Sequence, residues 1–270
     1  MNKLQLVPKF FKLIFSDTPM FLKALANYTI DAHYRTYYKS KYREPLKFAD
    51  IKDLSPSLHE HIENYTFLDG TSRVTDIALI MSICRRYENC DYLEIGSFRG
   101  ESLYNVSTVA RNCVSVSLSK DELLQMGVSK SSAEYQRFFT QNRKNIKHIE
   151  HNSLTFDFNS LNQKFDVIFI DADHSYPAVK KDTENAFKLL KNENSVIIWH
   201  DAGRGYEKHR FEVEAGILDG APKNAHPYIY RVTNTLCAIY TKEKIEAKML
   251  HSPQIPNKTF NVDIQLKPLK

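Results

Sequence analysis

Short apolar runs alternate with longer helical stretches through the middle of the chain. Helices are predicted over 74–88, 101–111, 131–143 and 177–190. The apolar runs predict five strands, Tyr92–Ile95, Val114–Leu118, Ile146–Ile149, Val167–Ile170 and Val196–Trp199. Strands that alternate with helices of this length form a parallel sheet with right-handed crossovers.

Two further β-rich runs, 228–232 and 236–241, flank a short polar segment and predict an antiparallel hairpin. The predicted fold class is therefore α/β: a doubly wound, Rossmann-like domain with a mostly parallel seven-stranded sheet that ends in this hairpin. We expect the domain to span 74–242, with an N-terminal helical extension over 1–73 and a C-terminal tail over 243–270.

The extension carries apolar residues at roughly helical spacing, with lysines between them. These apolar residues are Phe10, Phe11, Leu13, Ile14, Phe15, Phe21, Leu22 and Leu25. Such a stripe packs on a neighbouring domain or on a second copy of the chain in a homodimer; the alternative is peripheral contact with a membrane. Residues 1–50 hold nine Lys/Arg and four Asp/Glu, which accounts for the net charge of +5. This surplus suits an acidic partner or a membrane surface, or it is a solvated helix face.

Cysteine usage and hydropathy point to the cytoplasm. No apolar run reaches the ~20 residues of a membrane span, so no transmembrane segment is expected. Lys9 and Lys12 interrupt the N-terminal apolar stretch, which argues against a signal peptide. The four cysteines are scattered without metal-ligand spacing, and we expect free thiols in a reducing compartment.

A glycine turn follows the first strand, in the sequence DYLEIGSFRGES at 91–102. A strand that leads into a helix N-terminus leaves backbone N–H groups free to bind a ligand, and Gly96 lets that ligand approach closely. The spacing of Glu94, Gly96 and Gly100 differs from the dinucleotide pattern G-x-G-x-x-G. It resembles motif I of the class I S-adenosylmethionine-dependent methyltransferases, which implies that these residues and Ser97 bind the cofactor.

The second and third strands end in further candidate cofactor residues. The methyltransferase family usually has an acidic residue for the ribose at the end of the second strand, but this chain has Ser117, with Asp121 further along. A single hydroxyl replaces a bidentate carboxylate poorly. The resemblance implies that Asn152 and Ser153 contact the adenine; the alternative is an ordinary polar loop.

Acidic and imidazole side chains follow the fourth and fifth strands. Asp171, Asp173 and His174 end one apolar run, and His200 and Asp201 end the next. We expect them to converge, because the carboxyl ends of neighbouring parallel strands meet at one crevice. Such a set suits Mg²⁺ or Mn²⁺, which could hold substrate oxygens and assist loss of a hydroxyl proton.

The segment IDADHSY at 170–176 resembles the D-A-D-K-x-x-Y segment of metal-dependent O-methyltransferases of the catechol and caffeoyl-coenzyme A type. It also resembles the I-D-G-D-H-x-Y segment of a bacterial methyltransferase group often found in sugar or polyketide pathways. The resemblance implies that Asp171 is a catalytic, cofactor-binding and metal-binding residue and that His174 is the base. His200 or Asp201 would supply a second metal ligand; if Asp201 is the match, Ala202 leaves the metal site incomplete. The alternatives are that Asp173 caps a helix and that both histidines are structural.

A long polar stretch over 203–227 lies beside the expected substrate site. Its basic and aromatic side chains suit an anionic group of the substrate, or they form a solvated helix face; they are Arg204, Tyr206, Lys208, His209 and Arg210. We expect a methyltransferase that modifies a hydroxyl of a small molecule. The alternatives are a non-catalytic cofactor-binding scaffold and a nicotinamide-dependent oxidoreductase. No nucleic-acid partner is expected, because neither a D/N-P-P-Y/F motif nor a basic stripe is present.

Overall fold

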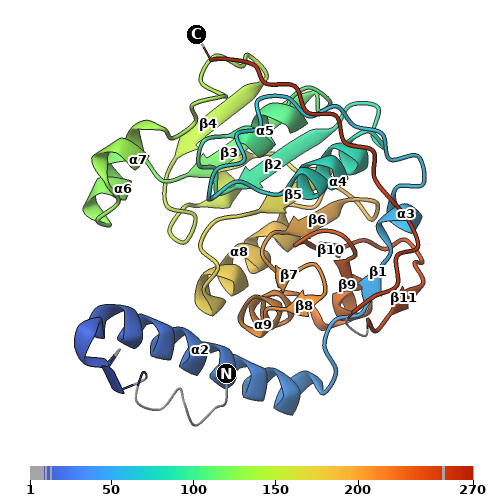
Figure 1. Ribbon diagram of the computed structural model, residues 1–270. Coiled ribbons are helices and arrows are strands. Elements are labelled where there is room, and N and C mark those ends of the chain that lie inside the picture. Colours follow the sequence, from blue (N-terminus) through green and yellow to red (C-terminus); the bar gives the residue numbers. More distant parts are fainter. Residues whose placement is uncertain (1–8, 10, 13, 251–252, 270) are drawn as a thin grey trace.

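The computed structural model describes residues 9, 11–12, 14–250 and 253–269, so Phe10 and Leu13 lie outside the described residues. Its main feature is a sheet with the strand order β11-β1-β9-β10-β6-β5-β2-β3-β4 (Figure 1). The strands of this sheet are β1 (Phe48–Ala49), β2 (Asp91–Ile95), β3 (Asn112–Ser117), β4 (Ile146–Glu150), β5 (Val167–Ile170), β6 (Val196–Trp199), β9 (Ile229–Val232), β10 (Ala238–Tyr240) and β11 (Ala247–Lys248).

The seven strands from β9 to β4 in this order confirm the predicted sheet and its terminal hairpin. β2 is parallel to both β3 and β5, β5 is parallel to β6, and β10 is antiparallel to β6 and β9. The strand order reverses beside β2, which creates a crevice at the carboxyl ends of β2 and β5. The two-residue strands β1 and β11 extend the sheet with residues from the segments expected to flank the domain.

Helices cover both faces of the sheet (Figure 1). They are α2 (Thr18–Tyr42), α3 (Ile51–Leu54), α4 (Val74–Cys84), α5 (Glu101–Val106), α6 (Lys120–Gln125), α7 (Lys130–Glu134), α8 (Tyr176–Lys188) and α9 (Phe211–Gly220), with 3₁₀ turns at Phe158–Leu161 and Lys223–Tyr228. Successive residues of a strand face opposite sides. Ile168 and Ile170 therefore share a buried cluster with residues of α8 and α9, whereas Val167 and Phe169 pack with α4 and α5.

Two predicted segments differ from the structure. The stretch 203–227 is not a long connection, because it contains the short pair β7 (Gly203–Gly205) and β8 (Lys208–His209), followed by α9 and a 3₁₀ turn. The helix predicted over 131–143 ends at Glu134, and Arg137 then adopts a positive φ of 60° that interrupts the helix.

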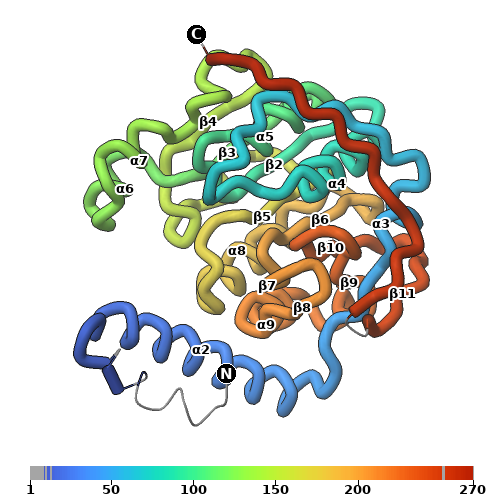
Figure 2. The backbone as a smooth tube through the Cα atoms, in the orientation of Figure 1, coloured from blue at the N-terminus to red at the C-terminus, as the bar shows by residue number. Residues whose placement is uncertain are grey.

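Helix α2 packs against α9 (Figure 2), and its Tyr38 is buried in the same cluster as residues of α8 and α9. The ring of Tyr34 stacks on Tyr176 of α8, with ring centroids 5.2 Å apart. Leu22 and Leu25 near the start of α2 are 56% and 50% exposed, so one chain alone leaves this end of the stripe uncovered. Among the described residues, no helix has the length and hydropathy needed to cross a membrane.

Candidate functional site

The glycine turn packs directly against the end of β5. Gly96 has a φ of +90°, and a Cβ at this position would lie 2.4 Å from the carbonyl oxygen of Asp171. Only glycine permits this approach, which joins the ends of β2 and β5. Gly100 has a φ of +82° at the start of α5, and a Cβ there would lie 2.8 Å from Thr140. Gly100 therefore sets the packing of the turn.

A cavity of about 240 Å³ opens at the ends of β2, β3, β4 and β5. Its walls include six of the predicted cofactor residues, Gly96, Ser97, Ser117, Asn152, Ser153 and Asp171. The hydroxyl oxygen of Ser117 is buried and has no hydrogen-bond partner in the described part of the chain. Asp121 is exposed on α6 and does not line this cavity. The cavity thus brings together residues from four strand ends.

Glu94 lies behind the cavity wall. Its carboxylate is fully buried and accepts hydrogen bonds from the hydroxyls of Tyr92, at 2.8 Å, and Ser102, at 3.2 Å. Burial is the main cause that raises the pKa of Glu94 to about 8, and the charge of Asp171 raises it further. Glu94, predicted to bind the cofactor, does not line the cavity, whereas Asp171 does.

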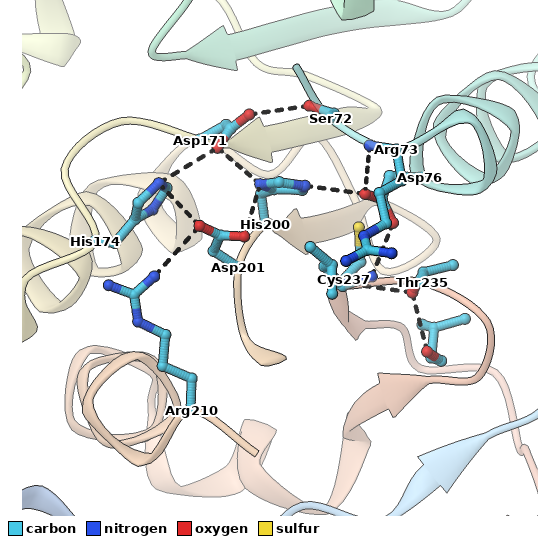
Figure 3. Close-up of polar contacts among 12 residues, drawn as sticks. Ser72, Arg73, Asp76, Asp171, His174, His200, Asp201, Arg210, Thr235 and Cys237 are labelled. Carbon is cyan, nitrogen blue, oxygen red and sulfur yellow. Dashed lines mark hydrogen bonds and ion pairs between the residues drawn. The ribbon is translucent and has the colours of Figure 1, made fainter. Parts of the chain in front are cut away.

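A chain of acids and imidazoles crosses the ends of β5 and β6 (Figure 3). His200 Nδ1 lies 3.0 Å from Asp171 Oδ1, and His200 Nε2 lies 3.0 Å from Asp76 Oδ2. The second oxygen of Asp171 accepts a hydrogen bond from Ser72. Asp201 has a positive φ of 51°, and its Oδ1 lies 3.5 Å from His200 Nδ1. Four of the five residues predicted to converge at these strand ends are therefore in one cluster, namely Asp171, His174, His200 and Asp201.

Two neighbouring carboxylates, those of Asp171 and Asp76, set the charge of His200. Burial disfavours its protonated form, but the charges and hydrogen bonds of Asp171 and Asp76 outweigh burial and raise the pKa well above its ordinary value. Burial likewise disfavours ionised Asp171, and His200 outweighs it and lowers the pKa of the carboxyl. Both shifts favour an ion pair between the two side chains.

His174 stands between Asp171 and Asp201. Its Nε2 lies 3.3 Å from Asp201 Oδ2 and 3.9 Å from Asp171 Oδ1, and its side chain is 31% exposed. Arg210 Nη1 lies 3.3 Å from the same Oδ2 atom of Asp201 (Figure 3). An imidazole held by carboxylates but open to solvent is suitable as a proton acceptor.

A second cavity of about 380 Å³ adjoins Asp201. Helix α2 supplies Asn27 and Ile30 to its wall, and the remaining lining residues are Asp201, Gly203, Arg204, Arg210, Glu212 and Leu236. Of the five basic and aromatic residues predicted to meet the substrate, only Arg204 and Arg210 line this cavity. His209 instead pairs with the buried Glu214, at 2.6 Å.

A family model described as a methyltransferase domain matches residues 93–202, from β2 through the acid–imidazole cluster. The matched range includes the glycine turn and the ends of β5 and β6. Residues 93–202 are therefore similar to a methyltransferase domain. No curated protein sequence matches the chain.

Solved structures resemble the chain at low identity. The O-methyltransferase from Bacillus cereus in complex with SAH is 18% identical, with a TM-score of 0.45 over 65% of this chain and 84% of that chain. An S-adenosylmethionine-dependent methyltransferase from Clostridium acetobutylicum is 22% identical, with a TM-score of 0.34 over 46% and 48%. SAM-bound CalS10, an amino pentose methyltransferase of calicheamicin biosynthesis from Micromonospora echinaspora, is 15% identical, with a TM-score of 0.35 over 52% and 58%. Each of these TM-scores is below 0.5.

Two site residues come from outside the matched methyltransferase domain and were not predicted. Asp76 belongs to the first turn of α4, where it also accepts the backbone N–H groups of Arg73 and Leu236, each at 2.8 Å. Ser72 precedes the same helix. An acid in the first turn of a helix is an ordinary capping feature, so the sequence carried no signal that Asp76 reaches His200. Asp173 accepts the N–H and hydroxyl of Ser175, but the N-cap residue of α8 is Ser175, so the alternative in which Asp173 caps this helix is wrong.

Proposed function

We propose that the chain transfers the methyl group of S-adenosylmethionine to a hydroxyl oxygen of a small molecule. The arrangement of the two cavities around His174 carries this proposal. Asp171 lines the first cavity and Asp201 lines the second, and His174 lies within 4 Å of both carboxylates. We assign the first cavity to the cofactor and the second to the hydroxylated acceptor.

The walls of the first cavity suit a polar nucleoside ligand. The unpartnered hydroxyl of Ser117 is a ready hydrogen-bonding group for the ribose, although it lacks the second oxygen of a carboxylate. Gly96 brings the turn into contact with the end of β5, so the backbone of both strand ends contributes to the wall of this cavity. Asn152 and Ser153 provide polar groups in the cavity wall for the adenine, as the family resemblance implies.

The proposed reaction needs a proton acceptor and a fixed geometry. The bound cofactor supplies a methyl group on a positively charged sulfur, which an oxygen attacks in line. His174 accepts the acceptor's hydroxyl proton at Nδ1, because Nε2 keeps its own hydrogen toward Asp201 Oδ2 at 3.3 Å, and Asp201 stabilises the resulting imidazolium. Ion-paired Asp171 remains negative at the border of the cofactor cavity, where it favours a cationic ligand. Positioning supplies the remainder of the rate enhancement.

The residues present do not fit the divalent metal that the resemblance implies. His200 directs both ring nitrogens at carboxylates, so neither offers a lone pair to a metal. Within the described ranges, no group of three or more His, Cys, Asp or Glu side chains is arranged to hold an ion. The proposed transfer therefore includes no metal step.

We also place the protein in the cytoplasm, and the support is that all four cysteines are buried free thiols.

Titration calorimetry and a methyl-transfer assay test the proposal. We expect S-adenosylhomocysteine to bind and NAD not to bind. With radiolabelled S-adenosylmethionine and a panel of hydroxylated compounds, His174→Asn should lower kcat by about 10²–10⁴-fold without weakening S-adenosylhomocysteine. His59→Asn, at an exposed position, is the control.

Three results would contradict parts of the proposal. Binding of NAD alone would indicate an oxidoreductase. Binding of S-adenosylhomocysteine without any turnover would indicate a non-catalytic scaffold. An unchanged kcat in His174→Asn would remove His174 from the reaction.

A further inference from the structure

We infer that the imidazolium of His200 is a built-in cation that takes the place of a divalent metal in this site, with Asp76 as its positioning residue. The inference deepens the proposed function and rests on it. Its first support is the hydrogen-bond geometry of the ring. Each ring nitrogen lies 3.0 Å from a carboxylate oxygen, Nδ1 from Asp171 and Nε2 from Asp76.

Both nitrogens of this ring must carry hydrogen. A neutral imidazole has one N–H and one lone pair, and the lone pair would then face a carboxylate oxygen at hydrogen-bond distance. Such a contact is repulsive, whereas an imidazolium donates to both acids. The ring is 8% exposed and the Asp76 side chain is fully buried, so the attraction is only weakly screened by water.

The carboxylate oxygens that would bind a metal already face donors. Asp171 Oδ1 faces His200, and Asp171 Oδ2 accepts from Ser72 at 3.1 Å. Asp201 Oδ1 lies 3.5 Å from His200, and Asp201 Oδ2 lies 3.3 Å from both His174 and Arg210. A divalent ion between these two acids would stand beside His200 and Arg210, and both charges repel it.

Asp76 makes this arrangement possible from outside the matched domain. Its carboxylate is fixed by the backbone N–H groups of Arg73 and Leu236, so it holds His200 Nε2 from a rigid position. Without Asp76, burial would favour a neutral ring that keeps its one hydrogen toward Asp171 and adds no positive charge to the site. The charge on His200 therefore depends on a residue that touches neither cavity.

Manganese binding tests the inference without any methyl acceptor. Electron paramagnetic resonance of Mn²⁺, titrated into the whole chain with S-adenosylhomocysteine present, counts bound metal directly. We expect no site in the wild type at millimolar Mn²⁺, and an S-adenosylhomocysteine affinity that changes less than twofold with a chelator. His200→Asn keeps a hydrogen-bonding side chain but removes the cation, and it should raise Mn²⁺ affinity at least tenfold. Asp171→Asn in the same background should abolish that gain.

Stoichiometric Mn²⁺ binding to the wild type that disappears in Asp171→Asn would overturn the inference. So would a His200→Asn variant that folds, as judged by circular dichroism, and gains no Mn²⁺ affinity. If His200→Asn does not fold, Asp76→Asn is measured in its place. Loss of the Asp76 carboxylate should remove the positive charge from His200 and thereby raise the Mn²⁺ affinity. An Asp76→Asn variant that folds and gains no Mn²⁺ affinity would also overturn the inference. Failure of S-adenosylhomocysteine to bind at all would instead contradict the proposed function, so the two failures are distinguishable.

Discussion

At the scale of single residues, Gly96 has the strictest requirement in the site. Its φ of +90° is unfavourable for other residues, and an added Cβ would lie 2.4 Å from the backbone of Asp171. We expect Gly96→Ala to lower the free energy of unfolding by about 2–4 kcal/mol, because backbone strain and steric overlap add. Urea denaturation measures the stability, and calorimetry should show at least a tenfold loss of S-adenosylhomocysteine affinity.

Gly127 offers a matched control for this substitution. It has a similar φ of +82°, but a Cβ there would meet no atom within 4 Å. Gly127→Ala should therefore lower the free energy of unfolding by only about 1 kcal/mol, because backbone strain is the sole cost there. Equal losses in the two variants would show that the contact between the ends of β2 and β5 is not tight.

At the scale of elements, one buried carboxylate docks α2 on the rest of the chain. Asp219 of α9 accepts from Tyr37 at 2.5 Å, Tyr176 at 2.7 Å and Lys41 at 2.5 Å, and also from Tyr42. We expect Asp219→Asn to weaken the docking by about 1–3 kcal/mol, since several charge-assisted hydrogen bonds are lost. Hydrogen exchange should then show at least tenfold lower protection in α2 than in the wild type.

The exposed Asp263 supplies the control, because Asp263→Asn removes a carboxylate of the tail without touching α2. Unchanged protection of α2 in Asp219→Asn would contradict the docking role. The result matters for the second cavity too, since α2 contributes Asn27 and Ile30 to its wall.

Helices and strands could be predicted from the sequence where the buried residues are apolar. They could not be predicted where charged or polar residues are buried against one another. The parallel strands are continuous apolar runs, so their positions follow from the sequence. Helix α9 was missed because its acids make it look like a loop. Glu214 is buried against Arg231 and His209, and Asp219 against tyrosines, so these acids belong to a packed helix. The candidate site could be predicted only in part for the same reason. Local motifs indicate Asp171 and His200, but Asp76 lies 124 positions before His200 in the sequence, and only folding places it beside that ring.

At the scale of the whole molecule, two buried carboxyl groups make the folded state more stable at acidic pH than at neutral pH. Burial is the main cause that raises the pKa of Asp182 from 3.8 to about 7 and that of Glu94 from 4.5 to about 8. The folded state therefore keeps two protons that the unfolded chain releases near pH 4. Their stabilising contribution is complete below that pH and is lost as the pH rises through 7 to 8. Each group contributes a slope of roughly 1.4 kcal/mol per pH unit within its window.

Replacing one of these groups by its amide isolates its share of the pH dependence. Asp182 is fully buried on α8 and lines neither cavity, so Asp182→Asn tests stability apart from ligand binding. An amide cannot ionise, and the variant should lose free energy of unfolding less steeply than the wild type between pH 4 and 7. Urea denaturation at one-unit pH steps measures both slopes, with Asp263→Asn expected to follow the wild type. A wild-type stability that rises with pH across this window would contradict the argument, because it would mean that the unfolded chain, and not the folded one, retains the protons.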